Sequence, residues 1–204
     1  MTKRRYEWIS EVRIMGAFLR AIAFRAIADA PGGARHATTR HTSQYKPILF
    51  VLILLMAIEI PVMHLLLAHV LGSGGWKTVL QRVIAGLSAY GVIWLIGDAR
   101  LMRESAHVLR PEGLELRLGL RWNGLVPYDA IDRVARAPGV LSPRPGAVDI
   151  TPVGMDTPNV VVYLRTRIEL YGIFNIPRTA DEVRLFVDEP NALIAALREV
   201  MHAD

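Results

Sequence analysis

One long apolar run carries residue types that can do chemistry inside a membrane. The run from Leu54 to Leu67 reads LLMAIEIPVMHLLL, which places Glu59, Pro61 and His64 among aliphatic side chains. A carboxylate and an imidazole are groups from which intramembrane proton relays and ion sites are built. Each is costly in hydrocarbon, so it needs a partner or a change of protonation. Proton- or ion-linked transport through Glu59 and His64 is therefore one hypothesis for function.

The surroundings of these residues predict two transmembrane helices. Positions 47–71 contain no Lys or Arg, and a helix of that length covers about 37 Å, more than a hydrocarbon core of about 30 Å. A second apolar run, 78–97, would cover about 30 Å. Residues 72–77 form a short glycine-rich turn between the two runs. The alternative is a hairpin buried in a soluble core, which we disfavour because such helices are usually shorter and more interrupted.

A hairpin with this short turn brings polar residues of both helices to similar depths. Glu59 is expected level with Ser88, and His64 level with Arg82. Pro61 removes one backbone hydrogen bond, which predicts a kink beside Glu59. We predict an intramembrane polar cluster of Glu59, Pro61, His64, Arg82, Ser88 and Tyr90. Because two helices alone cannot enclose a pathway, we favour polar contacts between helices or between protomers over a relay.

Basic residues are distributed unevenly around the two runs. The turn carries only Lys77, whereas the outer flanks carry Arg35, Arg40, Lys46, Arg100, Arg103 and Arg110. Cytoplasmic loops of membrane proteins are enriched in such residues. The sequence therefore predicts a multi-pass membrane protein with both termini in the cytoplasm.

The N-terminal segment, residues 1–46, holds most of the positive charge. It contains nine Lys or Arg against three acids, whereas residues 98–204 contain thirteen Arg against fifteen acids. This distribution argues against nucleic acid as a partner, because a binding domain concentrates positive charge on its folded face. Residues 6–28 predict a basic amphipathic helix on the anionic leaflet or, alternatively, against the C-terminal domain. The expected lipid-headgroup contacts are Lys3, Arg4, Arg5, Arg13, Arg20 and Arg25.

Residues 98–204 form the predicted C-terminal domain, in which the periodicity changes from helical to alternating after Arg103. Leucines at 114, 116 and 118 alternate with charged residues, and Gly119 permits a turn before a return strand at Arg121. Further strands are expected at 131–135, 148–151, 160–166, 169–175 and 183–187. The stretch 188–190, Asp-Glu-Pro, then predicts the start of a helix. Short strands followed by one terminal helix indicate a curved antiparallel sheet or barrel closed by that helix, and hence an α+β membrane protein.

The order of these elements resembles a known family. Two spans followed by HVLRPEGLELRLGLRWNGLVPYDAI, with a VP-x-x-x-I step from Val126 to Ile131, and a closing VRLFVDEPNALIAALREV are similar to small bacterial membrane proteins with a cytoplasmic PH-like domain. The resemblance covers about residues 45–202. It implies a PH-like fold anchored at the bacterial inner membrane, and it implies no catalytic site.

One feature of this domain departs from that family, and another allows an alternative interpretation. Residues 138–159 contain five prolines and three glycines, a long connection that is either a binding loop or a mobile one. Arg110, Arg117 and Arg121 could form part of a basic, anion-binding hairpin. We favour a solvated strand face instead, because Glu112 and Glu115 dilute that charge.

Motifs for catalysis are not found in the sequence. It has no cysteine, and its histidines do not show the spacing of a metal pair. We therefore predict no catalytic, cofactor or metal residues and no small-molecule substrate. The expected function is an interaction module at the cytoplasmic membrane surface, with the bilayer and a protein partner or a second copy as partners. Transport and anionic-lipid sensing are the alternatives.

Overall fold

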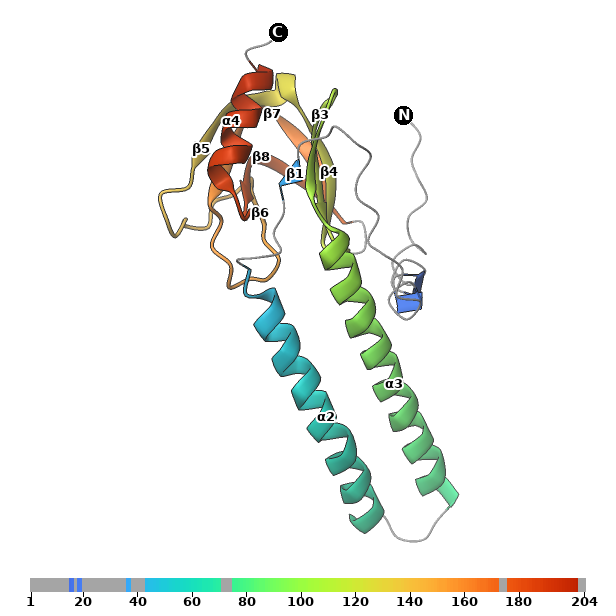
Figure 1. The fold of residues 1–204 in the computed structure, drawn as a ribbon. Coiled ribbons are helices and arrows are strands. Elements are labelled where there is room, and N and C mark those ends of the chain that lie inside the picture. The colour runs from blue at the N-terminus through green and yellow to red at the C-terminus, as the bar shows by residue number, and fades with distance from the viewer. Residues whose placement is uncertain are drawn as a thin grey trace.

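The computed structural model describes residues 15–16, 18–19, 36–37, 43–70, 75–172 and 176–201. Two long helices project from one end of a curved β-sheet, and a shorter C-terminal helix packs on that sheet (Figure 1). The six N-terminal headgroup residues predicted from sequence lie outside the described residues. An α+β fold with two apolar helices, a sheet and a terminal helix is confirmed.

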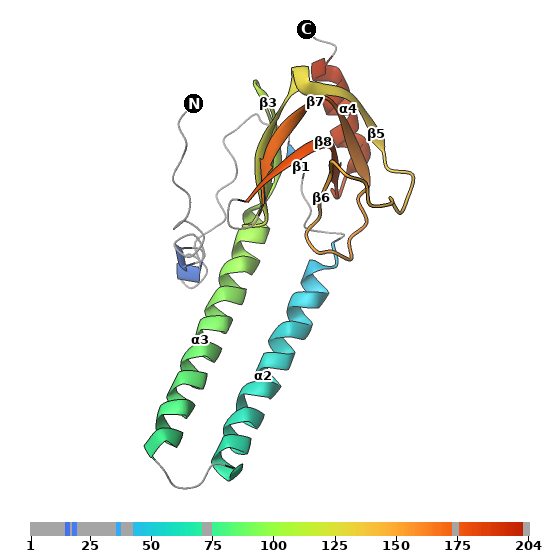
Figure 2. The ribbon, with the colours of Figure 1, turned by 180° about the vertical axis from the view of Figure 1, so that it is seen from behind.

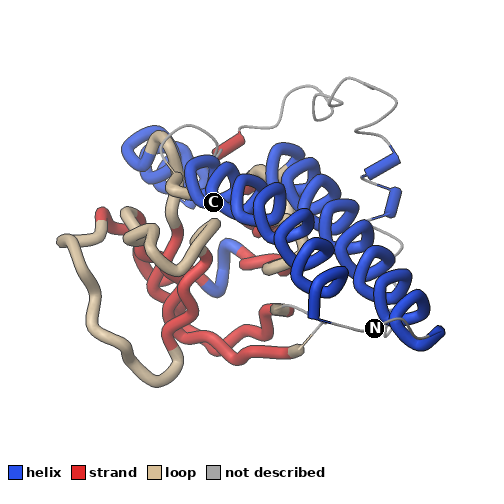
Figure 3. Tube along the Cα trace, turned by 90° about the horizontal axis from the view of Figure 1, so that it is seen from below, coloured by secondary structure: helices blue, strands red, loops and turns tan. Residues whose placement is uncertain are grey.

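The two long helices are α2, Tyr45–Val70, and α3, Gly75–Glu104. Both are long and apolar enough to cross a membrane, and none of the apolar window of either helix is buried inside the protein. They run antiparallel and side by side (Figures 2 and 3). A Cβ added at Gly91 would lie 3.1 Å from the Met56 methyl carbon. This close approach gives the register in which Glu59 and Ser88 are level, as predicted.

Helix α3 extends beyond the apolar run that is predicted to span the membrane. It continues through Gly97 to Glu104, so the first residues of the predicted C-terminal domain, 98–104, are the last turns of this helix. Asp98, Leu101 and Met102 are buried there, and Met102 joins the core of the sheet. Helix α2 likewise continues through Pro61 without a break.

The sheet has the strand order β1-β2-β3-β4-β7-β8-β6, and β5 pairs with β7. The strands are β1 His36–Ala37, β2 His107–Arg110, β3 Gly113–Leu118, β4 Trp122–Pro127, β5 Ile131–Arg136, β6 Ala147–Ile150, β7 Val160–Tyr171 and β8 Pro177–Leu185. Within the described ranges β1 and β6 do not pair with each other, so the sheet is open rather than a closed barrel. The ladder of β6 with β8 is parallel, which corrects the prediction of a wholly antiparallel sheet.

Strand β7 accounts for the curvature. The two strands predicted at 160–166 and 169–175 are one strand that ends at Tyr171. Its first half pairs with β5, its last residue pairs with Asn123 of β4, and its register against β8 shifts between Tyr163 and Ile168. Such irregularities bend a strand and increase its twist. One long strand therefore joins the two halves of the sheet.

The core lies on the concave side of the sheet under the terminal helix. The leucines of β3 at 114, 116 and 118 are fully buried, as their alternation predicts. Helix α4, Pro190–Met201, begins at the predicted proline and contributes Leu193 and Leu197 to the same core. The VP-x-x-x-I step contains a short 3₁₀ turn, Tyr128–Ala130, which leads from β4 to β5. Gly119 has a φ of 54°, so the predicted turn uses the left-handed conformation that glycine permits.

Candidate functional site at the junction of the helices and the sheet

A buried ion pair joins α3 to the tip of the first hairpin. Arg121, between β3 and β4, donates from Nη1 to Asp98 Oδ1 at 2.9 Å and from Nη2 to Asp98 Oδ2 at 3.0 Å. Bidentate arginine–carboxylate pairs are both strong and geometrically specific. Only 5% of the Asp98 side chain is exposed, against 24% for Arg121. The last turns of α3 are thus held in one orientation relative to the sheet.

The first turn of α2 belongs to the same cluster. The Tyr45 hydroxyl donates to Asp98 Oδ2 at 2.9 Å, and the Arg121 guanidinium lies 5.5 Å from the centroid of the Tyr45 ring. Asp98 therefore accepts from both the sheet and the other helix. A cation over an aromatic face adds a further attraction. Tyr45, Asp98 and Arg121, which we call the junction cluster, link α2, α3 and the β3–β4 turn.

A second carboxylate fixes the start of α2. Asp156, in the loop between β6 and β7, is buried and accepts from the Ser43 hydroxyl at 2.6 Å and from the Gln44 backbone N–H at 2.8 Å. The Ser43 hydroxyl in turn accepts from the Tyr45 N–H at 3.0 Å. Negative charge at a helix N-terminus satisfies free N–H groups and complements the helix dipole. Both helices are therefore attached to the sheet by carboxylates at the ends nearest to it.

A serine forms hydrogen bonds at the C-terminal end of α3. The Ser105 hydroxyl donates to the Leu101 carbonyl at 2.7 Å and accepts from the Gly119 N–H at 2.6 Å. Ser105 is buried. It joins the last turn of the helix to the same β3–β4 turn that carries Arg121. The chain between α3 and β2 is consequently short and hydrogen-bonded, unlike a flexible linker.

The predicted intramembrane cluster is only partly brought together. Ser88 is half-buried on the face of α3 toward α2, but Glu59 is exposed and has no hydrogen-bond or ion-pair partner among the described residues. His64 Nδ1 lies 2.9 Å from the Ile60 carbonyl of its own helix. Five residues along a helix are about 140° apart around its axis, so Glu59 and His64 point in different directions. Arg82 and Tyr90 are exposed on α3, and Pro61 on α2.

The three arginines of the predicted basic hairpin all have acidic partners. Arg110 and Arg117 both bind Glu115, the latter at 2.6 Å, while Arg121 binds Asp98. Partial burial would raise the pKa of Glu115, but hydrogen bonds from the two arginines outweigh it and hold that pKa below its usual range. The positive charge of this hairpin is therefore largely compensated within the chain.

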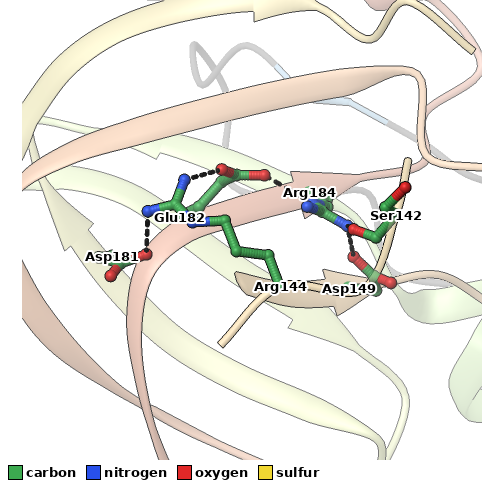
Figure 4. A network of polar contacts seen from close by, with 6 residues as sticks. All are labelled: Ser142, Arg144, Asp149, Asp181, Glu182 and Arg184. Carbon is green, nitrogen blue, oxygen red and sulfur yellow. Dashed lines mark hydrogen bonds and ion pairs between the residues drawn. The ribbon is translucent and has the colours of Figure 1, made fainter. Parts of the chain in front are cut away.

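The long connection 138–159 is ordered by charges. It contains β6, and its first part covers the outer face of β8 through a network of Ser142, Arg144, Asp149, Asp181, Glu182 and Arg184 (Figure 4). Arg184 Nε donates to Glu182 at 2.6 Å, and Arg144 donates to the same carboxylate at 2.8 Å. The side chains of Glu182 and Arg184 are 6% and 5% exposed. The buried pair of Glu182 and Arg184, with its several hydrogen bonds, holds this connection against the sheet.

His107 is the most deeply buried ionisable side chain. It lies at the start of β2, fully inaccessible to solvent, and burial lowers its pKa to about 4. Its Nδ1 is 3.4 Å from the Arg117 backbone N–H, and Nε2 has no partner within the described protein. The imidazole is therefore neutral at physiological pH.

Sequence reasoning named Arg121 only as part of a basic hairpin and missed Tyr45, Asp98, Ser43 and Asp156, the other polar residues of this junction. Asp98 is an acid directly after an apolar run, and Ser43 precedes a long helix, which is the usual position of a capping residue. Those local signals mark helix ends but do not identify Arg121 or Asp156 as partners. No family model, curated protein or solved structure matches this chain. The resemblance to PH-like membrane proteins thus stays a prediction, and function has to be inferred from geometry.

Proposed function

We propose that this chain is a membrane-anchored interaction protein. The α2–α3 hairpin crosses the bacterial inner membrane, and the sheet forms a PH-like module that is presented in a fixed orientation at the cytoplasmic surface. The module binds a protein partner or a second copy of the chain. No step of catalysis is assigned to it.

The junction is the observation that carries this proposal. No part of the apolar window of either helix is buried inside the protein, which is unfavourable in water and suited to lipid. At the sheet end the exposed apolar surface gives way to Tyr45, Asp98 and Arg121, which are joined by hydrogen bonds. A module that only needed attachment could use a flexible linker. Attachment through both helices favours a role in which orientation toward the membrane matters.

Confinement at the membrane explains how such a module can act through modest contacts. Tethering raises the effective concentration of a partner that is itself at the membrane, so modest contacts suffice. The positive flanks, including Lys46 and Arg103, support the cytoplasmic side for the sheet. The strand-rich module with one terminal helix agrees with the PH-like fold that the resemblance implies.

Topology can be tested directly because the chain has no cysteine. Single cysteines at Ser73, in the turn, and at Asn191, exposed in α4, would be treated with a membrane-impermeant maleimide in intact and in opened cells. We expect labelling of S73C in intact cells and of N191C only after opening. The reverse pattern, or recovery of the full chain in buffer without detergent, contradicts the proposal.

The role of orientation can be tested in the same cells. A proximity-labelling enzyme fused after residue 204 would record the neighbours of the native chain and of D98N/R121Q, in which the charged pair is replaced by neutral amides. If orientation matters, the variant stays in the membrane but loses the specific neighbours of the native chain. An unchanged set of neighbours would show that attachment alone is sufficient.

A further inference from the structure

Exposed apolar side chains on the sheet module are not spread evenly. Among its described residues the large exposed ones are Leu125, Val140, Met155, Tyr171 and Ile176. Three of these five lie at two places that we call tips: Met155, in the loop between β6 and β7, and Tyr171 with Ile176, which end β7 and directly precede β8. Isolated exposed apolar residues are ordinary on protein surfaces. Their gathering at two particular tips requires an explanation.

The first tip lies beside the start of α2. Met155, whose side chain is 74% exposed, directly precedes Asp156. The Asp156 carboxylate accepts from the Gln44 N–H, one residue before α2 begins. The loop between β6 and β7 accordingly approaches the upper end of α2 in both views (Figures 1 and 2). Met155 is therefore close to the level at which this helix leaves the sheet and its apolar run begins.

The second tip lies beside the sheet end of α3. The Gly172 N–H donates to the Ile176 carbonyl at 2.9 Å, which holds the two strands together. A Cβ added at Gly172 would be 3.9 Å from the Arg121 carbonyl oxygen, so this tip adjoins the turn that binds Asp98 of α3. Ile176 is 52% exposed at this position. The two tips thus flank the two helices at corresponding heights.

Uncompensated cations accompany the tips. Lys46, at the start of α2, and Arg178, two residues after Ile176, are exposed and have no acidic partner among the described residues. Arg110 and Arg117, in contrast, share Glu115. Cations beside apolar side chains suit the boundary between anionic headgroups and acyl chains.

We propose that these two tips dock on the lipid surface, with Met155 and Ile176 at the headgroup–acyl boundary and Lys46 and Arg178 at lipid phosphates. The proposal rests on the membrane-spanning role of the hairpin and adds a second, peripheral contact. Lipid is the occupant because the tips adjoin the ends of helices whose exposed apolar surface continues into the bilayer. The sheet is then held at the membrane by three contacts: the helical hairpin and one tip on either side of it.

Single-cysteine variants of the full chain test this contact. M155C, I176C, V140C and L55C would each carry an environment-sensitive fluorophore, in nanodiscs of phosphatidylethanolamine and phosphatidylglycerol. L55C reports the exposed surface of α2, and V140C reports the β5–β6 loop, which projects sideways from the sheet (Figure 1). We expect blue-shifted emission, and quenching by lipid-attached quenchers, at positions 155 and 176 as well as 55. Position 140 should report water.

The outcomes separate this proposal from the proposed function. A water-like spectrum at 155 or at 176, with L55C in lipid, overturns the docking of the tips and leaves the anchor intact. If the tips bind a protein in cells and not lipid, the purified chain lacks that protein, and positions 155 and 176 should likewise report water. A water-like spectrum at position 55 would overturn the anchor itself. As a matched measurement, K46Q/R178Q should weaken quenching at 155 and 176 several-fold and leave L55C unchanged.

Discussion

The helical hairpin and the sheet module place charged and apolar side chains in opposite ways. In the hairpin, apolar side chains such as Leu55 are exposed, and the one carboxylate in the apolar run, Glu59, has no partner among the described residues. In the module, leucines such as Leu116 are fully buried, and the buried acids Asp98 and Glu182 are bound by arginines. Each region is organised for a different solvent, and the junction cluster lies where the two meet.

This contrast shows which interactions carry stability in each region. Burial of apolar surface and pairing of buried charges stabilise the module within the chain itself. The hairpin gains little from its own contacts, because its apolar surface faces outward, and in the proposed function lipid covers that surface. The same substitution should therefore have different effects in the two regions.

The largest expected difference is between two leucines. Leu116→Ala removes a fully buried side chain from the sheet core and should lower the free energy of unfolding of the module by about 3–5 kcal/mol. Leu55 is 54% exposed, so Leu55→Ala should change the free energy of unfolding of the module by no more than about 0.5 kcal/mol. Denaturant unfolding of the full chain in micelles, followed by near-ultraviolet circular dichroism, measures both. Equal losses would contradict the division into two regions.

The junction should respond next most strongly. Arg121→Met leaves the buried Asp98 carboxylate without its charged partner and should cost about 3 kcal/mol of module stability. Arg117→Met is the matched control, because its pair with Glu115 is exposed and such pairs contribute under about 1 kcal/mol. The same unfolding assay applies. If the two variants are equally stable, the junction does not hold the module.

Acid should destabilise the module through His107. Its pKa is lowered to about 4 in the folded state, so between about pH 6.5 and 4 the unfolded chain binds a proton that the folded chain does not. Stability therefore falls with falling pH in this window, by about 2 kcal/mol from pH 7 to pH 5. His107→Leu should remove this part of the pH dependence. An unchanged pH profile in the variant would place the acid sensitivity elsewhere.

The smallest effect is expected for Glu59→Gln. The carboxylate is exposed on the hairpin and has no described partner, so its neutralisation should leave module stability unchanged and should not reduce membrane insertion. Fractionation of membranes and unfolding of the module check these two points. Proton flux in liposomes that is present in the native chain and lost in a normally inserted variant would instead support the transport hypothesis.

Much of the architecture could be predicted because it is encoded locally. The two helices follow from composition alone, since an apolar run of this length needs no tertiary partner to become a helix in lipid. The alternation of leucines in β3 and the proline at position 190 likewise marked a strand and a helix start correctly. The bend of β7 was missed because one long irregular strand and two short strands have the same local pattern.

By itself, then, the sequence determined which segments are apolar helices, that a strand-rich region follows them, and where the last helix begins. Only the tertiary structure decided that Arg121 binds Asp98, that Asp156 holds Ser43 across 113 positions, and that Glu59 faces outward. The reason is physical. Periodicity reports the environment of each segment, whereas pairing of distant charges depends on how the strands are ordered and where the helices end.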